Sequence, residues 1–174
     1  MASQKKIKNS KIPKKETKSK ETFFQRTENF IKINLKYIFL ISLFLSILCS
    51  ILIFNLRIHE GGDDSGYIEM GYNFIKGKSF PTWHGELYAI FLGILIGIFG
   101  LNIFILKLSS FVFVTLQLIF LYLAFKNRIS SIILAITLLL ISVTYNILFH
   151  ASQTYSEAIY MFILSYSYPG KVLL

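Results

Sequence analysis

The stretch YIFLISLFLSILCSILIFNL, residues 37–56, has no charged side chain in twenty consecutive positions. A helix of about 20 apolar residues crosses the hydrocarbon core of a bilayer, and backbone groups in lipid lack partners unless the segment is helical. Two further uncharged runs of similar length follow at 108–125 and 129–149. The sequence therefore predicts an all-α polytopic membrane protein. Cys49 inside the first run is interpreted as a small apolar filler.

The segment before this run carries most of the positive charge. Residues 1–36 hold eleven of the 18 Lys and Arg residues and three of the nine carboxylates. Such a polar segment cannot bury a core, so we expect a disordered tail. Basic residues stay on the cytoplasmic side of a span and attract anionic lipid, which predicts a cytoplasmic amino terminus and an uncleaved signal anchor at 37–56. Membrane lipids, and not nucleic acid, are the expected partners of this tail.

The direction of the later segments depends on whether 88–106 crosses the membrane. If it does, Lys107 alone separates two spans, and the basic turn at 126–128 lies outside. If 88–99 is instead an interfacial or re-entrant helix, the second span is 105–125 and the basic turn is cytoplasmic. A single lysine offers no Gly, Pro or Asn to reverse the chain, and short basic turns stay inside, so the second threading is favoured.

The favoured threading predicts about four transmembrane helices in the plasma membrane, with membrane-parallel surface helices in the first external loop. The expected order is a cytoplasmic tail at 1–36, a span at 37–56, an external loop at 57–104 with surface helices at about 65–76 and 88–99, a span at 105–125, a cytoplasmic turn at 126–128, a span at 129–149, an external turn at 150–156 and the start of a fourth span at 157–174. In this order Glu157 shares the extracytoplasmic side with Asp63 and Asp64.

The external loop contains the adjacent carboxylates Asp63 and Asp64 after two glycines. Apolar residues then recur at 67, 70, 71, 74 and 75, which predicts a short amphipathic helix lying on the outer membrane surface. One aspartate would stand at its N-cap. A helix has one N-cap, however, and a carboxylate pair can also accept a proton from a hydroxyl or hold a divalent cation. From the residues alone, both interpretations stay open.

The order of these motifs resembles the first external loop of the GT-C glycosyltransferases, in the branch of protein mannosyltransferases and aminoarabinose transferases. The likeness covers about 37–165 and lies in a span, Gly-Asp-Asp-x-x-Tyr-x-x-x-Gly at 62–71, Lys-Gly-Lys-Ser-Phe-Pro at 76–81, Phe-Gly at 99–100 followed by Lys-Leu-Ser at 107–109, and Ser-Glu-Ala at 156–158. Family members have several hundred residues. The resemblance therefore implies the amino-terminal part of such an enzyme, truncated in its fourth span. It leaves open whether this part is active on its own.

The resemblance implies inverting transfer of a sugar from a polyprenyl-phosphate carrier to a glycan, lipid or protein acceptor on the extracytoplasmic face. Such a transfer needs one base and no covalent carboxylate intermediate. Asp63 is the implied base, and Asp64 would orient the acceptor or tune the base, because adjacent carboxylates do not both ionise freely. The implied substrate-binding residues are Tyr67, Glu157, Lys78 and Lys107.

Each of these roles has a simpler competitor. Lysines near a membrane extend to the headgroup layer, and a carboxylate at the end of a span can simply be solvated. His59, His84 and His150 lie in three segments without ligand spacing, so no zinc site is predicted. The competing function is a small non-enzymatic membrane protein, such as a transporter or flippase component or an accessory subunit. Against a transporter, the span interiors carry no charged coupling residues.

Overall fold

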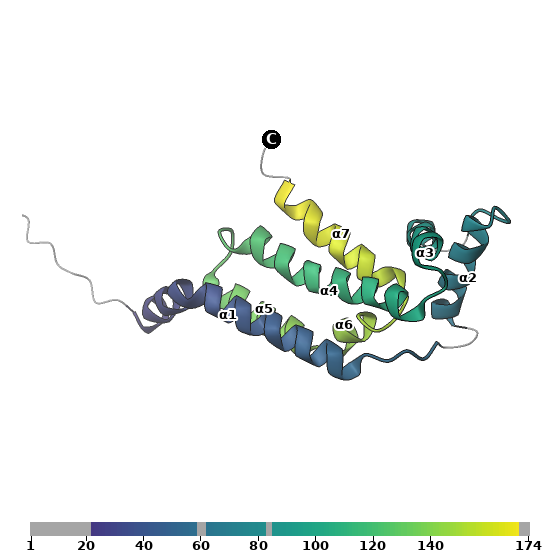
Figure 1. The fold of residues 1–174 in the computed structure, drawn as a ribbon. Helices are drawn as coiled ribbons and strands as arrows, with labels where there is room; N and C mark the ends of the chain where they lie inside the picture. Colours follow the sequence, from purple (N-terminus) through teal and green to yellow (C-terminus); the bar gives the residue numbers. More distant parts are fainter. Residues whose placement is uncertain (1–21, 59–61, 83–84, 171–174) are drawn as a thin grey trace, which may run out of the picture.

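The computed structural model describes residues 22–58, 62–82 and 85–170 (Figure 1). All regular elements of these segments are helices: α1 (Phe23–Ile53), α2 (Asp63–Ile75), α3 (Glu86–Phe99), α4 (Ile103–Phe125), α5 (Ser131–Val143), α6 (Tyr145–His150) and α7 (Ser156–Gly170). The all-helical class is thereby confirmed for these residues. The expectations for residues 1–21, for His59 and His84 and for the end of the fourth span at 171–174 lie outside the described residues.

Helix α1 begins at Phe23, and not near residue 37 as the sequence analysis expects. Its start is closed by a capping box, in which the Thr22 hydroxyl accepts the N–H of Gln25 and the Gln25 side chain accepts the N–H of Thr22. Two N–H groups that lack helical partners are satisfied in this way. The expected disordered tail is therefore corrected for residues 23–36, which are helical.

Among the described residues, two helices are long and apolar enough to cross a membrane, namely α1 and α4. Helix α4 covers the expected second span. The expected third span at 129–149 is not one helix, because α5 has 13 residues and α6 has six, with extended backbone at Thr144 between them. The Thr144 hydroxyl donates to the carbonyl of Leu140, a bond back into the preceding turn that favours bending of a helix. Four spans and a surface position of α2 and α3 stay predictions.

The long helices form a bundle in which α4 packs along α7 and α1 packs along α5 (Figure 1). On α1, Ser42, Ser46 and Ser50 recur every four residues and are buried. Small side chains at this spacing let helix backbones approach closely, as is common between helices in lipid. Helices α2 and α3 pack on each other at the far end of this bundle, beyond the carboxyl-terminal end of α1.

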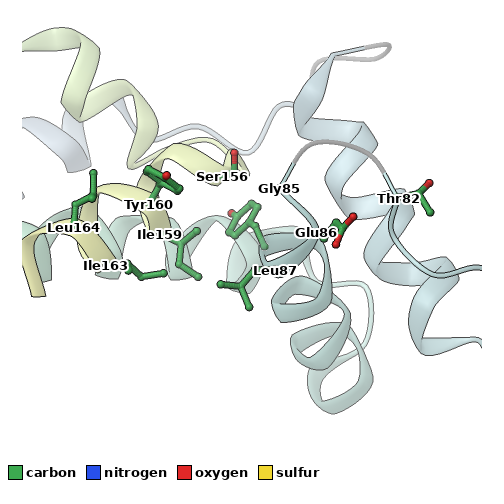
Figure 2. A pocket seen from close by; sticks show the side chains of 10 residues that line it. Thr82, Gly85, Glu86, Leu87, Ser156, Ile159, Tyr160, Ile163 and Leu164 are labelled. Atoms are coloured by element: carbon green, nitrogen blue, oxygen red, sulfur yellow. The ribbon is translucent and has the colours of Figure 1, made fainter. Parts of the chain in front are cut away.

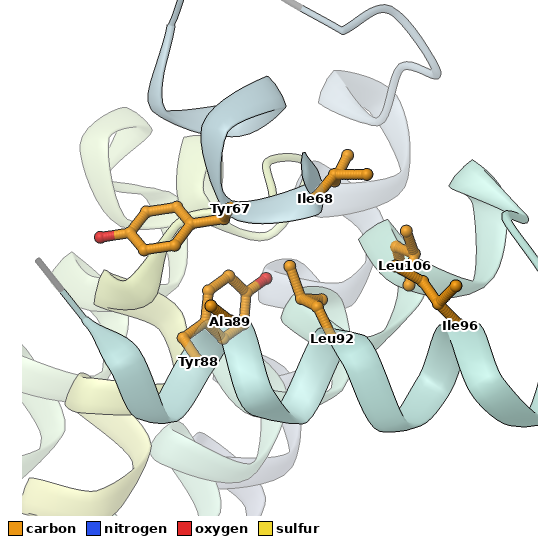
Figure 3. Close-up of a cluster of buried hydrophobic side chains, with 7 residues drawn as sticks. All are labelled: Tyr67, Ile68, Tyr88, Ala89, Leu92, Ile96 and Leu106. Carbon is orange, nitrogen blue, oxygen red and sulfur yellow. The ribbon is translucent and has the colours of Figure 1, made fainter. Parts of the chain in front are cut away.

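The pair α2–α3 is held together at Gly71 and Gly93. A Cβ on Gly71 would lie 2.8 Å from the carbonyl oxygen of Ala89, and a Cβ on Gly93 would lie 2.8 Å from the carbonyl oxygen of Gly71. Around this crossing a buried cluster forms, in which Leu106 of α4 joins side chains of α2 and α3 (Figure 3): Tyr67, Ile68, Tyr88, Ala89, Leu92 and Ile96. The cluster thus fixes both short helices on the start of α4.

Substitution of Gly93 by Ala should separate α2 from α3, because the new methyl group meets backbone atoms that cannot move aside. We expect a loss of about 1–3 kcal/mol in stability, typical of overpacking. Gly97→Ala is the matched control, since it lies one turn later on α3 and its Cβ would meet only the side chain of Ile75, at 3.2 Å. Thermal unfolding of the detergent-solubilised proteins compares the two, and equal midpoints would contradict the close crossing.

Candidate functional site

The two adjacent aspartates lie in the first turn of α2, and neither is its N-cap. The N-cap is Gly62, which corrects the expectation of an aspartate there. Carboxylates in the first turn of a helix are stabilised by its dipole without being the cap. Successive helical residues point about 100° apart, and here Asp63 is exposed whereas Asp64 is fully buried. The local helix therefore gives the two carboxylates different environments.

Asp64 is the centre of a buried polar network. Its Oδ2 lies 3.4 Å from Nζ of Lys107, and both side chains are 0% exposed. Its Oδ1 accepts the N–H of Thr154 at 2.7 Å, and the Thr154 hydroxyl contacts the same oxygen and donates to the Asp64 carbonyl at 3.0 Å. The ammonium of Lys107 also donates to the carbonyl of Arg57 at 2.5 Å. These contacts join four parts of the chain: the loop that contains Arg57, helix α2, helix α4 and the turn before α7.

Two tyrosines near this network, Tyr67 of α2 and Tyr88 of α3, make separate hydrogen bonds to other segments. The Tyr67 hydroxyl donates to Oγ of Ser156 at 3.0 Å, and the Tyr88 hydroxyl shares a hydrogen bond of 2.8 Å with Oγ of Ser110. The two rings meet edge to face, with centroids 5.4 Å apart. Tyr67, which the resemblance implies as a substrate contact, is thus a buried part of the scaffold whose hydroxyl is bonded to the start of α7.

Two exposed carboxylates beside this network form what we call the acidic rim. Asp63 at the start of α2 and Glu157 at the start of α7 are both exposed. The pKa of the Tyr155 hydroxyl is raised from its ordinary value, mainly by burial and further by the negative charges of Asp64, Asp63 and Glu157. Three carboxylates from two segments far apart in sequence therefore act on one phenol. The fold brings the start of α2 and the turn at 150–156 to the same end of the bundle.

Next to this rim a groove of about 570 Å³ opens between the starts of α3 and α7 (Figure 2). Its walls are mainly apolar and include Leu87, Ile159 and Ile163, whereas Glu86 and Ser156 lie at its polar end. Ser156 is the residue that accepts the Tyr67 hydroxyl. A groove of this kind fits a long hydrocarbon chain with a polar head, because the chain is removed from water and the head stays at the polar end.

Comparison of the chain with protein-family models, with curated proteins and with solved structures found no match. The functional interpretation therefore depends on the geometry of the site and on the motif resemblance.

Two of the predicted site residues are lysines, Lys78 and Lys107. Lys78 lies beyond the carboxyl-terminal end of α2, with Nζ 5.7 Å from the centroid of the Tyr72 ring. Since α2 has 13 residues, its two ends are about 20 Å apart, and Lys78 is not brought to the acidic rim. Lys107 is at the site but buried beneath it. In the part of the chain that the structure describes, no group of three or more His, Cys, Asp or Glu residues could hold a metal ion.

The hydroxyl partners of Asp64, Tyr88 and Tyr67 carry no signal in the sequence. Thr154, Ser110 and Ser156 are ordinary hydroxyl residues in sequence, and no spacing distinguishes them. Lys107 did carry a usable signal, because it is a single charge between two apolar runs. A charge in such a place requires a partner of opposite sign. The carboxylates between residues 57 and 104 are candidates for this partner, and the structure pairs Lys107 with Asp64.

Replacing Lys107 by Met should destabilise the protein, because Asp64 then stays buried without its counter-charge. Breaking a buried pair from one side costs about 3–5 kcal/mol, whereas removing both charges costs much less. We therefore expect Lys107→Met to lower the unfolding midpoint strongly and the double variant Lys107→Met, Asp64→Asn to recover part of it. Lys76→Met, at an exposed position, is the control. A double variant no more stable than Lys107→Met would argue against the pairing.

Proposed function

We propose that the chain forms the acceptor-activating end of a GT-C-like glycosyltransferase that uses a polyprenyl-phosphate-linked sugar. The observation that carries this proposal is the exposed Asp63, held at the start of α2 by its buried neighbour Asp64 and accompanied by an apolar groove. The motif resemblance supports the same reaction class. In this proposal Asp63 is the general base for the acceptor hydroxyl or amine.

Asp63 suits the role of base better than Asp64. A general base must come within about 2.6–3.2 Å of the proton that it accepts. Asp64 is enclosed, with Oδ1 bonded to Thr154 and Oδ2 facing the Lys107 ammonium, so an acceptor does not reach it. Its proposed role is to anchor the first turn of α2, which positions Asp63. Glu157, at the start of α7, is the proposed second contact for the acceptor.

The proposed donor lies with its prenyl chain in the groove between α3 and α7. Its phosphate needs a cation at the same end of the bundle, and the buried Lys107 is already committed to Asp64. Arg57 is the better candidate, since its side chain is exposed and its carbonyl is bonded to Lys107 beside the site. A guanidinium binds phosphate oxygens through two parallel N–H bonds.

Asp63→Asn should slow transfer strongly and leave the fold intact, because the side chain is exposed. Loss of a general base lowers a rate by about 10²–10⁴-fold. The assay follows a radiolabelled sugar from a polyprenyl-phosphate donor into membrane-bound acceptors. Glu69→Gln is the matched control, an exposed carboxylate on the same helix. Transfer by Asp63→Asn at the rate of the unchanged protein would refute Asp63 as the base. Donor binding without any transfer by the unchanged chain would favour the non-enzymatic accessory function.

The proposal requires Asp63 and Glu157 to face outward and the basic turn to face the cytoplasm. Single cysteines introduced as Asp63→Cys, Glu157→Cys and Asn127→Cys, in a Cys49→Ser background, should report this. We expect an impermeant maleimide added to intact cells to label the first two and spare the third. All three positions are exposed, so protection reflects the side of the membrane. Labelling of only one of positions 63 and 157 would exclude a shared acceptor site.

A further inference from the structure

At the end of the bundle opposite α2, two segments far apart in sequence lie side by side (Figure 1). The amino-terminal part of α1 and the turn between α4 and α5 make up what we call the basic-end surface. Its members are all exposed: Arg26, Lys32, Lys36, Lys126 and Arg128.

A carboxylate on α1 joins these two segments. Oε2 of Glu28 accepts the hydroxyl of Ser130 at 2.6 Å and the N–H of Ile132 at 3.3 Å, and Oε1 accepts the N–H of Ser131 at 2.6 Å. The side chain thus caps the start of α5 from another helix and satisfies N–H groups that have no helical partner. Lys32 lies one turn along α1 from Glu28, and Arg128 lies two residues before Ser130. The cap therefore sets the distance between the basic residues of the two segments.

Aromatic packing fixes the other side of the same surface. The Phe39 ring of α1 stacks on the Tyr122 ring of α4, with centroids 4.2 Å apart and planes 12° apart. Nζ of Lys126 lies 5.9 Å from the centroid of the same Tyr122 ring. Beneath them, Leu35 packs in a buried cluster with Leu118 and residues of α5. The basic-end surface is consequently part of the folded bundle.

The charges of the described residues are divided unequally between the two ends. Glu28 is the one described carboxylate on α1 or the α4–α5 turn, and its oxygens are occupied by the cap of α5. The other five described carboxylates belong to α2, α3 and the start of α7: Asp63, Asp64, Glu69, Glu86 and Glu157. The basic-end surface therefore favours an anion.

Large apolar side chains stand beside these charges. Phe23, Phe24, Phe30 and Ile33 are 87%, 64%, 68% and 78% exposed, on the same part of α1 as Arg26 and Lys32. A helix with basic residues and exposed aromatic and aliphatic side chains fits the boundary between headgroups and acyl chains. It also continues directly into the apolar, membrane-length part of α1. This favours a lipid over a soluble polyanion as the occupant.

We propose that the basic-end surface binds the phosphate headgroups of anionic phospholipids, and that Glu28 is a positioning residue that holds its two halves together. Lipid binding by a surface assembled from two segments can be distinguished from attraction by net charge alone. Loss of Glu28 makes the chain more positive, which on net charge alone strengthens binding. In the assembled surface, its loss separates α1 from the α4–α5 turn and weakens binding. The two explanations thus predict opposite signs for one substitution.

The test places an environment-sensitive dye at Asn127→Cys in a Cys49→Ser background, so that the signal comes from the basic-end surface and not from the tail at 1–21. The full-length detergent-solubilised chain is titrated with phosphatidylglycerol, and with phosphatidylcholine as the uncharged control. We expect a saturable response to phosphatidylglycerol only. Glu28→Ala should weaken it severalfold. Lys32→Gln with Lys36→Gln should weaken it by about fivefold for each charge removed.

Lys76→Gln with Lys78→Gln is the matched control, because it removes two exposed lysines at the other end of the bundle and should leave the titration unchanged. Tighter binding by Glu28→Ala would overturn the positioning role. Equal weakening by the two lysine pairs would overturn the proposed location. A short single-stranded oligonucleotide that gives the same response as the lipid would overturn the choice of lipid. If Glu28→Ala does not fold, the comparison of the two lysine pairs still decides whether the surface binds lipid.

Discussion

The buried pair of Asp64 and Lys107 is the interaction on which the arrangement of this chain depends. Two charges removed from water are stable only when each faces the other and hydrogen bonds satisfy the remaining polar atoms. Here Thr154 supplies bonds to the carboxylate, and the carbonyl of Arg57 accepts from the ammonium. Four separate parts of the chain meet at this pair. Any movement of α2 away from α4 would leave a charge buried alone.

The close crossing of α2 and α3 determines which of the two adjacent aspartates pairs with Lys107. With Gly71 and Gly93 in backbone contact, α2 cannot turn about its axis without a clash. Its first turn therefore presents one aspartate to the interior and the other to solvent. Of the two adjacent residues, Asp64 is thus a structural anchor and Asp63 is an accessible carboxylate. A chemical role for Asp63 requires this division, since a base must be reachable and also firmly positioned.

The two ends of the bundle use carboxylates in different ways. At one end Asp64 is paired with a buried lysine, and the charges of Asp64, Asp63 and Glu157 help to raise the pKa of the Tyr155 hydroxyl. At the other end Glu28 accepts three hydrogen bonds from the start of α5 and leaves the neighbouring basic side chains exposed. Each end is thus held by an acidic side chain that bonds a distant segment. The resulting charge difference between the ends supports the proposed orientation, in which the basic end faces the cytoplasm.

The sequence by itself determined that the chain is helical and largely apolar, because long uncharged runs have no other way to satisfy their backbone groups in lipid. The apolar spacing after Asp64 also predicted α2, since a helical face is a local pattern. Other features were decided by tertiary structure. The packing of Leu35 of α1 against α5 joins segments far apart in sequence, and the break at Thr144 interrupts an apolar run that looks continuous. The early start of α1, in contrast, has a local cause in the capping box of Thr22 and Gln25. Which of Asp63 and Asp64 is buried depends on Lys107 and Thr154, which lie 43 and 90 residues away from Asp64. Contacts over such separations arise from the packing of whole helices, and no local pattern of residues encodes them.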